Sequence, residues 1–326
     1  MARPSVVVVG GGHGCARSLA ALSLLDVERT AVVTVADDGG SSGRLRRDHD
    51  VVALGDLRMA TLALAGGPGA GRDALHRDVH ALAALRFARG ELAGHSLGNL
   101  LLLGLLEEHG GDLLAALVRF AALVGADGRV LPATTRPVDL VARTASGTVE
   151  GQAAVATTRR IDEVRLEPGR PSAAPGVLDA LHRADLVLLG PGSLYTSIIP
   201  VLLVDGIADA LATTRARGVL VGNLREQPGE TEGMDLADHV EALRHHAPGL
   251  RLDVVLAHVP ADVPADLPGR ATASTTRPLA LDERRLAAAG ARLVRATLGD
   301  ERDGHDPALL AAAVGELLGD DGPVPR

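Results

Sequence analysis

Five residues near the N-terminus have the composition of a phosphate-binding turn. The run GGGHG (10–14) follows four valines (6–9) and precedes apolar residues at helical spacing. Glycine lets backbone amides approach a diphosphate closely, and the start of a helix adds partial positive charge. The dinucleotide fingerprint is incomplete, because its third glycine would fall on Cys15 or on Arg17. The run therefore indicates either a phosphate-binding loop or an ordinary tight turn.

A second loop combines two acids with small hydroxyl donors. It reads DDGGSSG (37–43) and directly follows a β-branched run (30–35). Asp37 and Asp38 at the end of a strand suit a ribose hydroxyl, a substrate hydroxyl or a magnesium ion, for which Asp38 is the candidate ligand. An exposed turn is the alternative reading of the same residues.

Two shorter motifs add polar groups at the starts of predicted helices. In GDLR, Asp56 is either a helix N-cap or a ligand residue next to Arg58. In GHSLGN, Ser96 is a candidate cap for the most apolar helix of the chain. Asn99 is one of only two asparagines, with Asn223, which favours a specific donor role for both.

Two later loops are candidates for an anion or sugar site. The segment GPGSLYTS (190–197) follows a predicted strand and carries four hydroxyls, including the only tyrosine, at a helix start. Asn223, Gln227, Glu230 and Thr231 lie in a loop that is too polar and too constrained by its Pro-Gly pair to be a plain linker.

The composition excludes several classes of protein. All 33 basic residues are arginines, so a Schiff-base lysine and a P-loop lysine are both excluded. A net charge of −8 and the absence of tryptophan argue against nucleic-acid binding. A single cysteine, Cys15, allows no internal disulfide, and a small buried residue is favoured over a low-pKa thiol there. The pair His245-His246 is expected on a solvated helix face rather than in a zinc site.

The same inspection predicts where the protein resides. The longest apolar stretch (97–106) is too short to span a bilayer, which needs roughly 18 apolar residues. Residues 1–10 lack the length and flanks of a secretory leader. We therefore expect a cytoplasmic protein with no membrane partner.

These motifs require an α/β framework to bring them together. Strand-like runs alternate with helical segments, which predicts a Rossmann-like, doubly wound, mostly parallel sheet in one domain (1–318), with a frayed tail (319–326). A helical insertion is expected at about 56–124. Short segments between 129 and 166 suggest an antiparallel excursion. Strands 6–9 and 32–35 should be parallel neighbours.

Taken together, the loops resemble the gluconeogenesis factor family of YvcK/CofD-like proteins, over nearly the whole chain. The residues that carry this resemblance are GGGHG (10–14), VTVADDGGSSGRLR (33–46), GDLR (55–58), GHSLGNLLL (94–102), GPGSLYTSIIP (190–200) and NLREQPGETEGMDLADHV (223–240).

The resemblance implies a ligand and a role. Members of this family are expected to bind a nucleotide diphosphate sugar, such as UDP-N-acetylglucosamine or UDP-glucose, or an NAD-like nucleotide, with Mg²⁺ as a possible companion. The implied role is regulation of cell-wall precursor supply, cell shape and growth on gluconeogenic carbon, through a protein partner and as a homodimer. The alternative is an enzyme similar to the sibling 2-phospho-L-lactate transferases, which act on a deazaflavin. We predict no catalytic residue.

Three positions depart from the family pattern. Ala53-Leu54 replace two prolines, Val201 replaces an asparagine, and Gly304 replaces an arginine before His305 and Asp306. Lost polar groups at these positions are expected to weaken ligand contacts or to change the choice of ligand.

The predicted ligand-binding residues are Gly10, Gly11, Gly12, His13, Gly14, Asp37, Asp38, Gly39, Gly40, Ser41, Ser42, Asp56, Arg58, Asn99, Gly190, Pro191, Gly192, Ser193, Tyr195, Thr196, Ser197, Asn223, Gln227 and Thr231.

Overall fold

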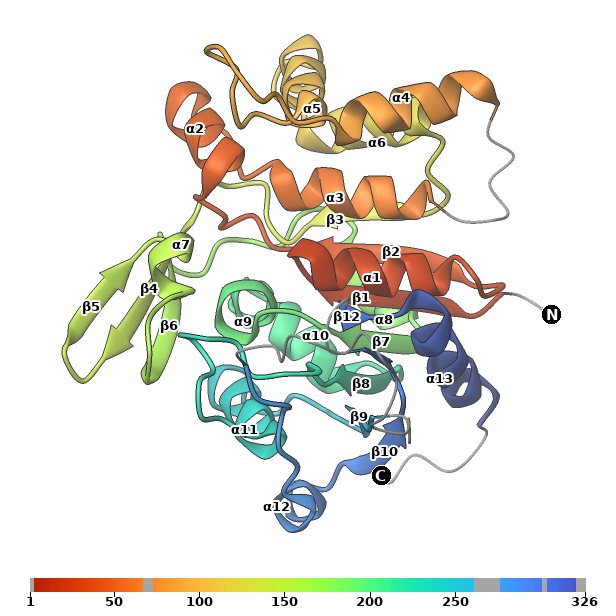
Figure 1. The fold of residues 1–326 in the computed structure, drawn as a ribbon, viewed down its shortest axis with the longest axis vertical. Helices are drawn as coiled ribbons and strands as arrows, with labels where there is room; N and C mark the ends of the chain where they lie inside the picture. Colours follow the sequence, from red (N-terminus) through yellow and green to blue (C-terminus); the bar gives the residue numbers. More distant parts are fainter. Residues whose placement is uncertain (1–2, 67–72, 261–275, 301–303, 321–326) are drawn as a thin grey trace, which may run out of the picture.

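A seven-stranded parallel sheet forms the centre of the computed structural model, which describes residues 3–66, 73–260, 276–300 and 304–320. The strand order is β10-β9-β8-β7-β1-β2-β3 (Figure 1). The strands are β1 (Ser5–Gly10), β2 (Glu28–Val33), β3 (Arg129–Pro132), β7 (Leu186–Leu189), β8 (Arg217–Val221), β9 (Val254–His258) and β10 (Arg292–Ala296). The expected mostly parallel α/β fold is therefore present.

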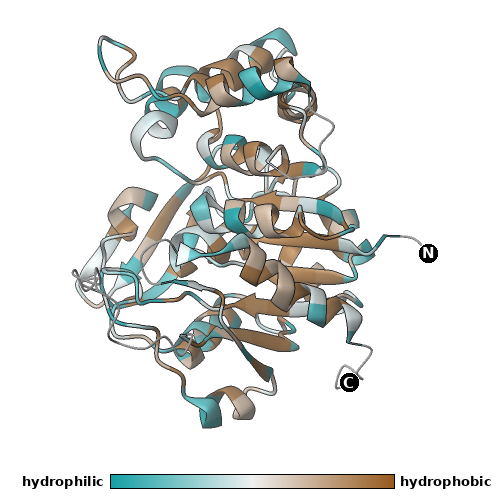
Figure 2. Ribbon diagram, turned by 45° about the vertical axis from the view of Figure 1, so that its right-hand side comes forward, coloured by the Kyte–Doolittle hydropathy of each residue, from teal (hydrophilic) through white to brown (hydrophobic). Residues whose placement is uncertain are grey.

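The valine run at 6–9 forms the middle of this sheet. Its four side chains are 0% exposed, because β1 has a strand on each side and helices on both faces. Continuous apolar runs of this kind are typical of buried parallel strands. Val9 pairs with Val32 of β2, which confirms that the first two strands are parallel neighbours. Figure 2 shows the apolar strands enclosed between the helices.

Helices cover the two faces of the sheet in separate groups. On one face α1 (Gly12–Leu22) packs against α3 (Gly55–Leu64) and α13 (Pro307–Gly319). The chain then winds outward from β7 in the opposite direction. The right-handedness of parallel crossovers therefore puts the following helices on the other face. That second group is α8 (Val177–Arg183), η1 (Leu194–Ile198), α9 (Ile199–Leu202), α10 (Ile207–Thr213), α11 (Leu236–His246) and α12 (Glu283–Ala288).

The helical insertion is smaller than the sequence suggests. It consists of α4 (Ala74–Ala84), α5 (Leu97–Glu108) and α6 (Leu113–Val124), which stack above the sheet in Figure 1. The preceding helix, α3, packs directly on β2 and β3 and so belongs to the sheet layer. The segment between α4 and α5 is not helical, and an isolated bridge joins Arg86 to Ser96.

The antiparallel excursion is present but begins later than expected. It is a three-stranded sheet in the order β5 (Gly147–Glu150), β4 (Asp139–Thr144) and β6 (Ile161–Glu167). The short helix α7 (Gln152–Val155) connects β5 to β6. The segment at 129–131 was expected in this group, but it forms β3 and pairs with β2 in the main sheet. Strand β10 and the two-residue strands β11 (Gly299–Asp300) and β12 (Gly304–His305) were not predicted.

Aspartates form the N-caps of several helices. Asp235 forms a capping box with Asp238 at the start of α11, and Asp306 accepts two amide hydrogen bonds at the start of α13. Within the expected tail, α13 continues to Gly319 and Asp320 pairs with Arg292. Residues 321–326 lie outside the described part.

The apolar helices of the chain are short. Within the described residues, no helix combines the length and the apolar character needed to cross a lipid bilayer.

Gly14 makes a close helix-loop contact possible, and this contact can be tested. A Cβ at this position would lie 2.0 Å from the Pro191 carbonyl oxygen. We expect Gly14→Ala to lower the free energy of unfolding by about 1 to 3 kcal/mol, as overpacking does.

The matched control is Gly104→Ala, in the interior of α5, where an added Cβ meets nothing within 4 Å. There the substitution should stabilise the protein by about 0.5 to 1 kcal/mol. Denaturant unfolding of both variants measures the two changes. Equal effects at the two positions would contradict the proposed packing role of Gly14.

Candidate functional site

The sheet has a topological switch point between β1 and β7. The chain leaves β1 toward β2 and β3, and later leaves β7 toward β8, β9 and β10 in the opposite direction. In open α/β sheets, ligands bind at the carboxyl ends of the strands beside such a point. The loops after β1 and β7 (10–14 and 190–193) meet there, although they are 180 residues apart in the sequence.

The loop after β1 is packed at its base and open at its tip. An added Cβ at Gly11 would lie 2.5 Å from the Asp56 Oδ2 atom, and Gly14 contacts Pro191. Gly12 has a φ of +61° with nothing within 4 Å of a Cβ position, and His13 is exposed. Gly11 and Gly14 therefore allow close packing, whereas Gly12 and His13 face open space.

The loop after β7 is fixed by hydrogen bonds from both sides. Ser18 of α1 donates to the Gly190 carbonyl at 3.1 Å. The Asn223 side chain accepts from the Gly192 amide and donates to the Gly192 carbonyl, both at 3.0 Å. Asn223 is therefore a positioning residue for this loop, and its amide is occupied by backbone groups rather than free for a ligand.

Gln227 and Thr231 support the same loop from the segment after β8. The Gln227 side chain donates to Ser193 Oγ at 2.8 Å, and its backbone amide donates to Thr231 Oγ1 at 3.2 Å. Thr231, which the sequence predicts as a ligand residue, is fully buried. Its hydroxyl instead stabilises the turn that presents Gln227.

Three hydroxyls that were predicted to bind a ligand are buried in the helix that follows. Tyr195, Thr196 and Ser197 lie in η1, which is a π-helix, and are at most 7% exposed. Burial raises the pKa of Tyr195 to about 12, and its hydroxyl approaches the Ile161 carbonyl at 3.5 Å. These residues support the loop from below, and the sequence pattern cannot separate this role from ligand binding.

Asp37 and Asp56 form a carboxylate pair beside the start of α1. Asp56 lies in the first turn of α3 rather than at its N-cap, which is Leu54. Burial and the nearby Asp37 raise the pKa of Asp56 to about 7, while the Gly12 amide and Arg58 lower it. Asp37 accepts a hydrogen bond from the Gly39 amide at 2.9 Å. The pair is therefore poised to bind a cation or to hold a proton near neutral pH.

Asp38 points away from this pair. It accepts a hydrogen bond from the Ala153 amide at 2.9 Å, at the start of α7. An added Cβ at Gly151 would lie 2.2 Å from Asp38 Oδ2. Asp38 thus connects the loop after β2 to the small antiparallel sheet. No group of three His, Cys, Asp or Glu residues that could hold a metal ion occurs among the described residues.

The acidic loop continues into a helix that the sequence did not predict, α2 (Gly40–His49). Gly39 is its N-cap, and Gly40 has a φ of +47° and faces open space. Ser41 and Ser42 are buried in its first turn, and Ser42 Oγ packs against Gly55. The two serines of this motif are therefore covered, whereas Asp37, Asp38, Gly39 and Gly40 are at least partly exposed.

The insertion contacts the first turn of α2 through polar side chains. Asn99 donates to Ser41 Oγ at 3.1 Å, and His95 Nδ1 lies 3.0 Å from the same oxygen. Arg58 is buried and donates to the Ala83 carbonyl at 3.5 Å. Ser96 occupies the N-cap position of α5, but its hydroxyl also donates to Ala83 and makes no cap hydrogen bond. These groups hold helices together, while Arg58 Nε and Asn99 Oδ1 are buried without a hydrogen-bond partner among the described residues.

Glu230 is a buried carboxylate that the predicted site omitted. It is 3% exposed, and neither carboxylate oxygen has a hydrogen bond of normal geometry within the described residues. Burial raises its pKa to about 7, although the Ser193 and Thr196 hydroxyls lower it. Glu230 belongs to the motif QPGET (227–231), but nothing in the sequence predicts that its side chain lies beneath η1.

Cys15 and His305 are also buried, and His246 is half-buried. Burial, with Asp56 nearby, raises the pKa of Cys15 to about 12, as expected for an inert small residue. His305 lies 3.1 Å from the Gly222 carbonyl, and burial lowers its pKa to about 4. The prediction of a solvated face is wrong for His246, whose Nε2 accepts from the Val164 amide at 2.9 Å.

The three family departures fall on structural positions. Val201 is 0% exposed within α9, and Ala53 and Leu54 are also fully buried. Gly304 has a φ of +79°, which favours glycine. The side chains present at 53, 54 and 201 are packed in the core.

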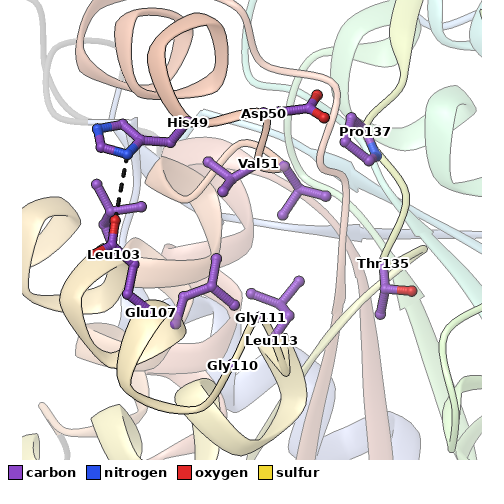
Figure 3. Close-up of a pocket in the computed structure, with 12 residues that line it drawn as sticks. His49, Asp50, Val51, Leu103, Glu107, Gly110, Gly111, Leu113, Thr135 and Pro137 are labelled. Carbon is purple, nitrogen blue, oxygen red and sulfur yellow. Dashed lines mark ion pairs between the residues drawn. The ribbon is translucent and has the colours of Figure 1, made fainter.

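A separate apolar cavity of about 420 Å³ lies at the far end of α2. Figure 3 shows His49 and Glu107 paired at one side of it, with 3.4 Å between His49 Nδ1 and Glu107 Oε1. Val51, Leu103 and Leu113 line the same cavity. Since α2 has ten residues, this cavity is about 15 Å from Gly40. It is not part of the switch-point site.

The doubly wound sheet and its open switch point define a Rossmann-like α/β protein. Residues 6–299 match the family described as 2-phospho-L-lactate transferase CofD. The chain therefore belongs to the CofD family.

Its relatives include gluconeogenesis factors. A Deinococcus radiodurans protein named "Putative gluconeogenesis factor" is 45% identical over 98% of this chain and 67% of its own length. The Bacillus subtilis "Gluconeogenesis factor" is 35% identical over 97% of this chain and 98% of its own. A crystal structure of a UPF0052 family member from Bacillus halodurans has a TM-score of 0.85 and 34% identity, covering 96% of this chain and 99% of that one.

The buried Glu230 predicts a specific dependence of stability on pH. Its folded pKa of about 7 is above the ordinary value of 4.5, so its favourable contribution is complete below pH 4.5 and is lost as the pH rises through 7. Glu230→Gln cannot titrate. We expect the free energy of unfolding of the wild type, relative to this variant, to fall by roughly 2 to 3 kcal/mol between pH 5 and pH 8.

Denaturant unfolding at the two pH values measures this difference. The matched control is Glu232→Gln, which removes a negative charge from the exposed side of the same loop. If the difference in free energy of unfolding between the wild type and Glu230→Gln stays constant with pH, the raised pKa of a buried Glu230 carboxylate is contradicted.

Proposed function

We propose that this protein binds a nucleoside diphosphate sugar, such as UDP-N-acetylglucosamine or UDP-glucose, at the switch point between β1 and β7. In this proposal it acts as a regulator that links central carbon metabolism to cell-wall precursor supply and cell shape. The naming of its relatives as gluconeogenesis factors supports the metabolic part. The geometry of the helix starts supports the ligand.

The observation that carries the proposal is that the two helices that start at the switch point have no side-chain N-cap. Helices α1 and α2 begin at glycine N-caps, with no side-chain cap and no acid in the first turn. Five other helices are capped by aspartates, namely Asp73, Asp112, Asp235, Asp282 and Asp306. Helices α7, α8 and α10 also begin at glycines without a side-chain cap, so α1 and α2 differ from them in lying at the carboxyl ends of β1 and β2 beside the switch point. Amides left open at a helix start, with the partial positive charge of the helix, favour phosphate oxygens.

The carboxylate pair is compatible with such an anion. Asp56 lies beside the Gly12 amide, and a charged carboxylate there would repel a diphosphate. With a pKa of about 7, Asp56 is neutral in a large fraction of molecules at physiological pH, and a bound anion would raise that fraction. Mg²⁺ also fits, because it commonly binds one or two carboxylates together with substrate phosphates, and Asp37 and Asp56 supply that set.

The exposed apolar residues support a contact with another protein. Five of the seven large hydrophobic residues that are exposed in the described chain lie on the helical insertion or its loop, at Leu75, Leu82, Leu85, Leu92 and Val118. Such a concentration is more typical of an interaction surface than of a solvated one. We include a homodimer and a partner in cell-wall precursor synthesis in the proposal.

Gly12 offers the most direct test of ligand binding. An alanine there would extend a methyl group into the open space above the start of α1. We expect UDP-N-acetylglucosamine, UDP-glucose or NAD to raise the melting temperature of the wild type, and Gly12→Ala to weaken that binding by about tenfold or more through lost amide contacts.

Gly110→Ala is the matched control, because Gly110 has a φ of +63° and open space around its Cβ position, but lies between α5 and α6. Both variants carry the same backbone strain. The proposal fails if no nucleotide shifts the wild-type melting temperature at millimolar concentration, or if the two variants bind equally well.

A second candidate function is transfer of a phosphorus-containing group, as the family description suggests. The observation that favours it is the pKa of Asp56, because a carboxylate that titrates near 7 is suited to act as a general base. If the protein is a transferase, Asp56→Asn should lower turnover by about 100-fold or more.

The assay combines the protein with magnesium, a deazaflavin and a guanylylated phospholactate or phosphoenolpyruvate donor, and detects the joined product by mass. Asp139→Asn, at the exposed Asp139–Arg46 ion pair, is the control for loss of one carboxylate. Absence of product with tight UDP-sugar binding would favour the regulator.

A further inference from the structure

A cavity of about 520 Å³ lies outside the switch point, on the outer side of the loop at 226–233. Three segments far apart in the sequence meet around it: the start of β6, the 226–233 loop and the segment that follows residue 275. Its lining residues are Arg159, Arg160, Glu226, Pro228, Glu232, Gly233, Thr276 and Arg277.

The charges around this cavity do not cancel. Arg159 pairs with Glu232 at 2.8 Å, and Glu226 accepts from the Gly233 amide at 3.3 Å. The side chains of Arg160 and Arg277 have no hydrogen bond or ion pair within the described residues, and both are exposed. Three arginines and two glutamates therefore line one cavity with a net positive charge, in a protein whose net charge is −8.

Arg160 is also held in an unusual backbone conformation. Its φ is +54°, in the left-handed region that favours glycine and is uncommon for arginine. It directly precedes β6, and the pairing of that strand with β4 fixes the backbone that follows. A conformation of this kind costs of order 1 kcal/mol or more and persists only where the surroundings impose it, often at ligand sites.

We propose that this cavity binds a small multivalent oxyanion, a phosphorylated or polycarboxylate metabolite, between the guanidinium groups of Arg160 and Arg277. Arginine suits this role because its planar donor fork binds phosphate or carboxylate oxygens in pairs. Glu232 opposes the anion little, because it is paired with Arg159, and the Glu226 carboxylate still leaves the lining with one net positive charge. This site is separate from the switch point and does not depend on the function proposed there.

The cavity nevertheless shares a loop with the switch point. Gln227, which donates to Ser193, lies between two lining residues of the cavity, Glu226 and Pro228. A Cβ added at Gly229, in the same loop, would lie 2.6 Å from the Ala156 carbonyl oxygen. An anion bound to Arg160 would therefore contact the loop that positions Ser193.

The test titrates the full chain with inorganic pyrophosphate and, separately, with tricarballylate, by isothermal calorimetry. We expect the wild type to bind at least one of them, and Arg160→Gly and Arg277→Gln each to raise the Kd by about tenfold or more. Arg160→Gly relieves the φ strain, so loss of binding cannot be attributed to misfolding. Binding of pyrophosphate alone indicates a phosphorylated ligand, and binding of both indicates a general oxyanion site.

Two controls locate the binding. Arg170→Gly has a matched φ of +52° at another exposed arginine and should leave the Kd unchanged. Gly12→Ala should leave the tricarballylate Kd unchanged and weaken only pyrophosphate that binds at the switch point, which separates the two sites. No binding of either probe at millimolar concentration, or binding that is lost in Gly12→Ala and retained in the two cavity variants, would overturn the inference. Failure of UDP-sugars to bind would contradict the function proposed for the switch point but not the binding of an oxyanion in this cavity.

Discussion

The close approach of the first turn of α1 to the loop after β7 is the contact on which the switch point depends. Gly14 has no side chain, which lets α1 lie directly against the Pro191 carbonyl. Ser18, one turn further along, donates to Gly190. Because the two loops are held together from beneath, their upper backbone faces form a single surface. Asn223 completes the arrangement from β8, with two hydrogen bonds to one glycine. A ligand at this surface meets backbone donors that are already in place, which reduces the ordering cost of binding.

Burial of carboxylates beside helix starts gives this region its pH sensitivity. Asp56 and Glu230 both have a pKa of about 7, so the folded protein binds more protons than the unfolded chain between about pH 4 and pH 7. His239 and His305 act in the opposite direction, because burial lowers the pKa of each to about 4 and the unfolded chain binds more protons below pH 6.5. The two effects partly cancel in total stability. A difference measured against Glu230→Gln isolates one of them.

Sequence reasoning located the framework better than it assigned roles to side chains. The valine run and the glycine turn depend on local patterns, and each is present as predicted. The assignment of 129–131 failed because a four-residue strand carries no signal of which sheet it joins. Helix α2 was missed because its first turn is made of glycine and serine. Tyr195 and Thr231 were assigned to a ligand because hydroxyls in a glycine-rich loop read alike, whether they face solvent or the core. Only the tertiary contacts separate these cases.

The position of α2 follows from the insertion as much as from the sheet. His95 and Asn99 hold the Ser41 hydroxyl, and Arg44 donates to the Ala93 carbonyl at 2.8 Å. At its other side α2 is held by Arg46, which donates to the Val138 carbonyl and pairs with Asp139 of β4. The Gly39–Gly40 end of α2 therefore lies where the insertion and the small antiparallel sheet together put it. Any displacement of the insertion must move Ser41 and, through it, the open amides beside Asp37.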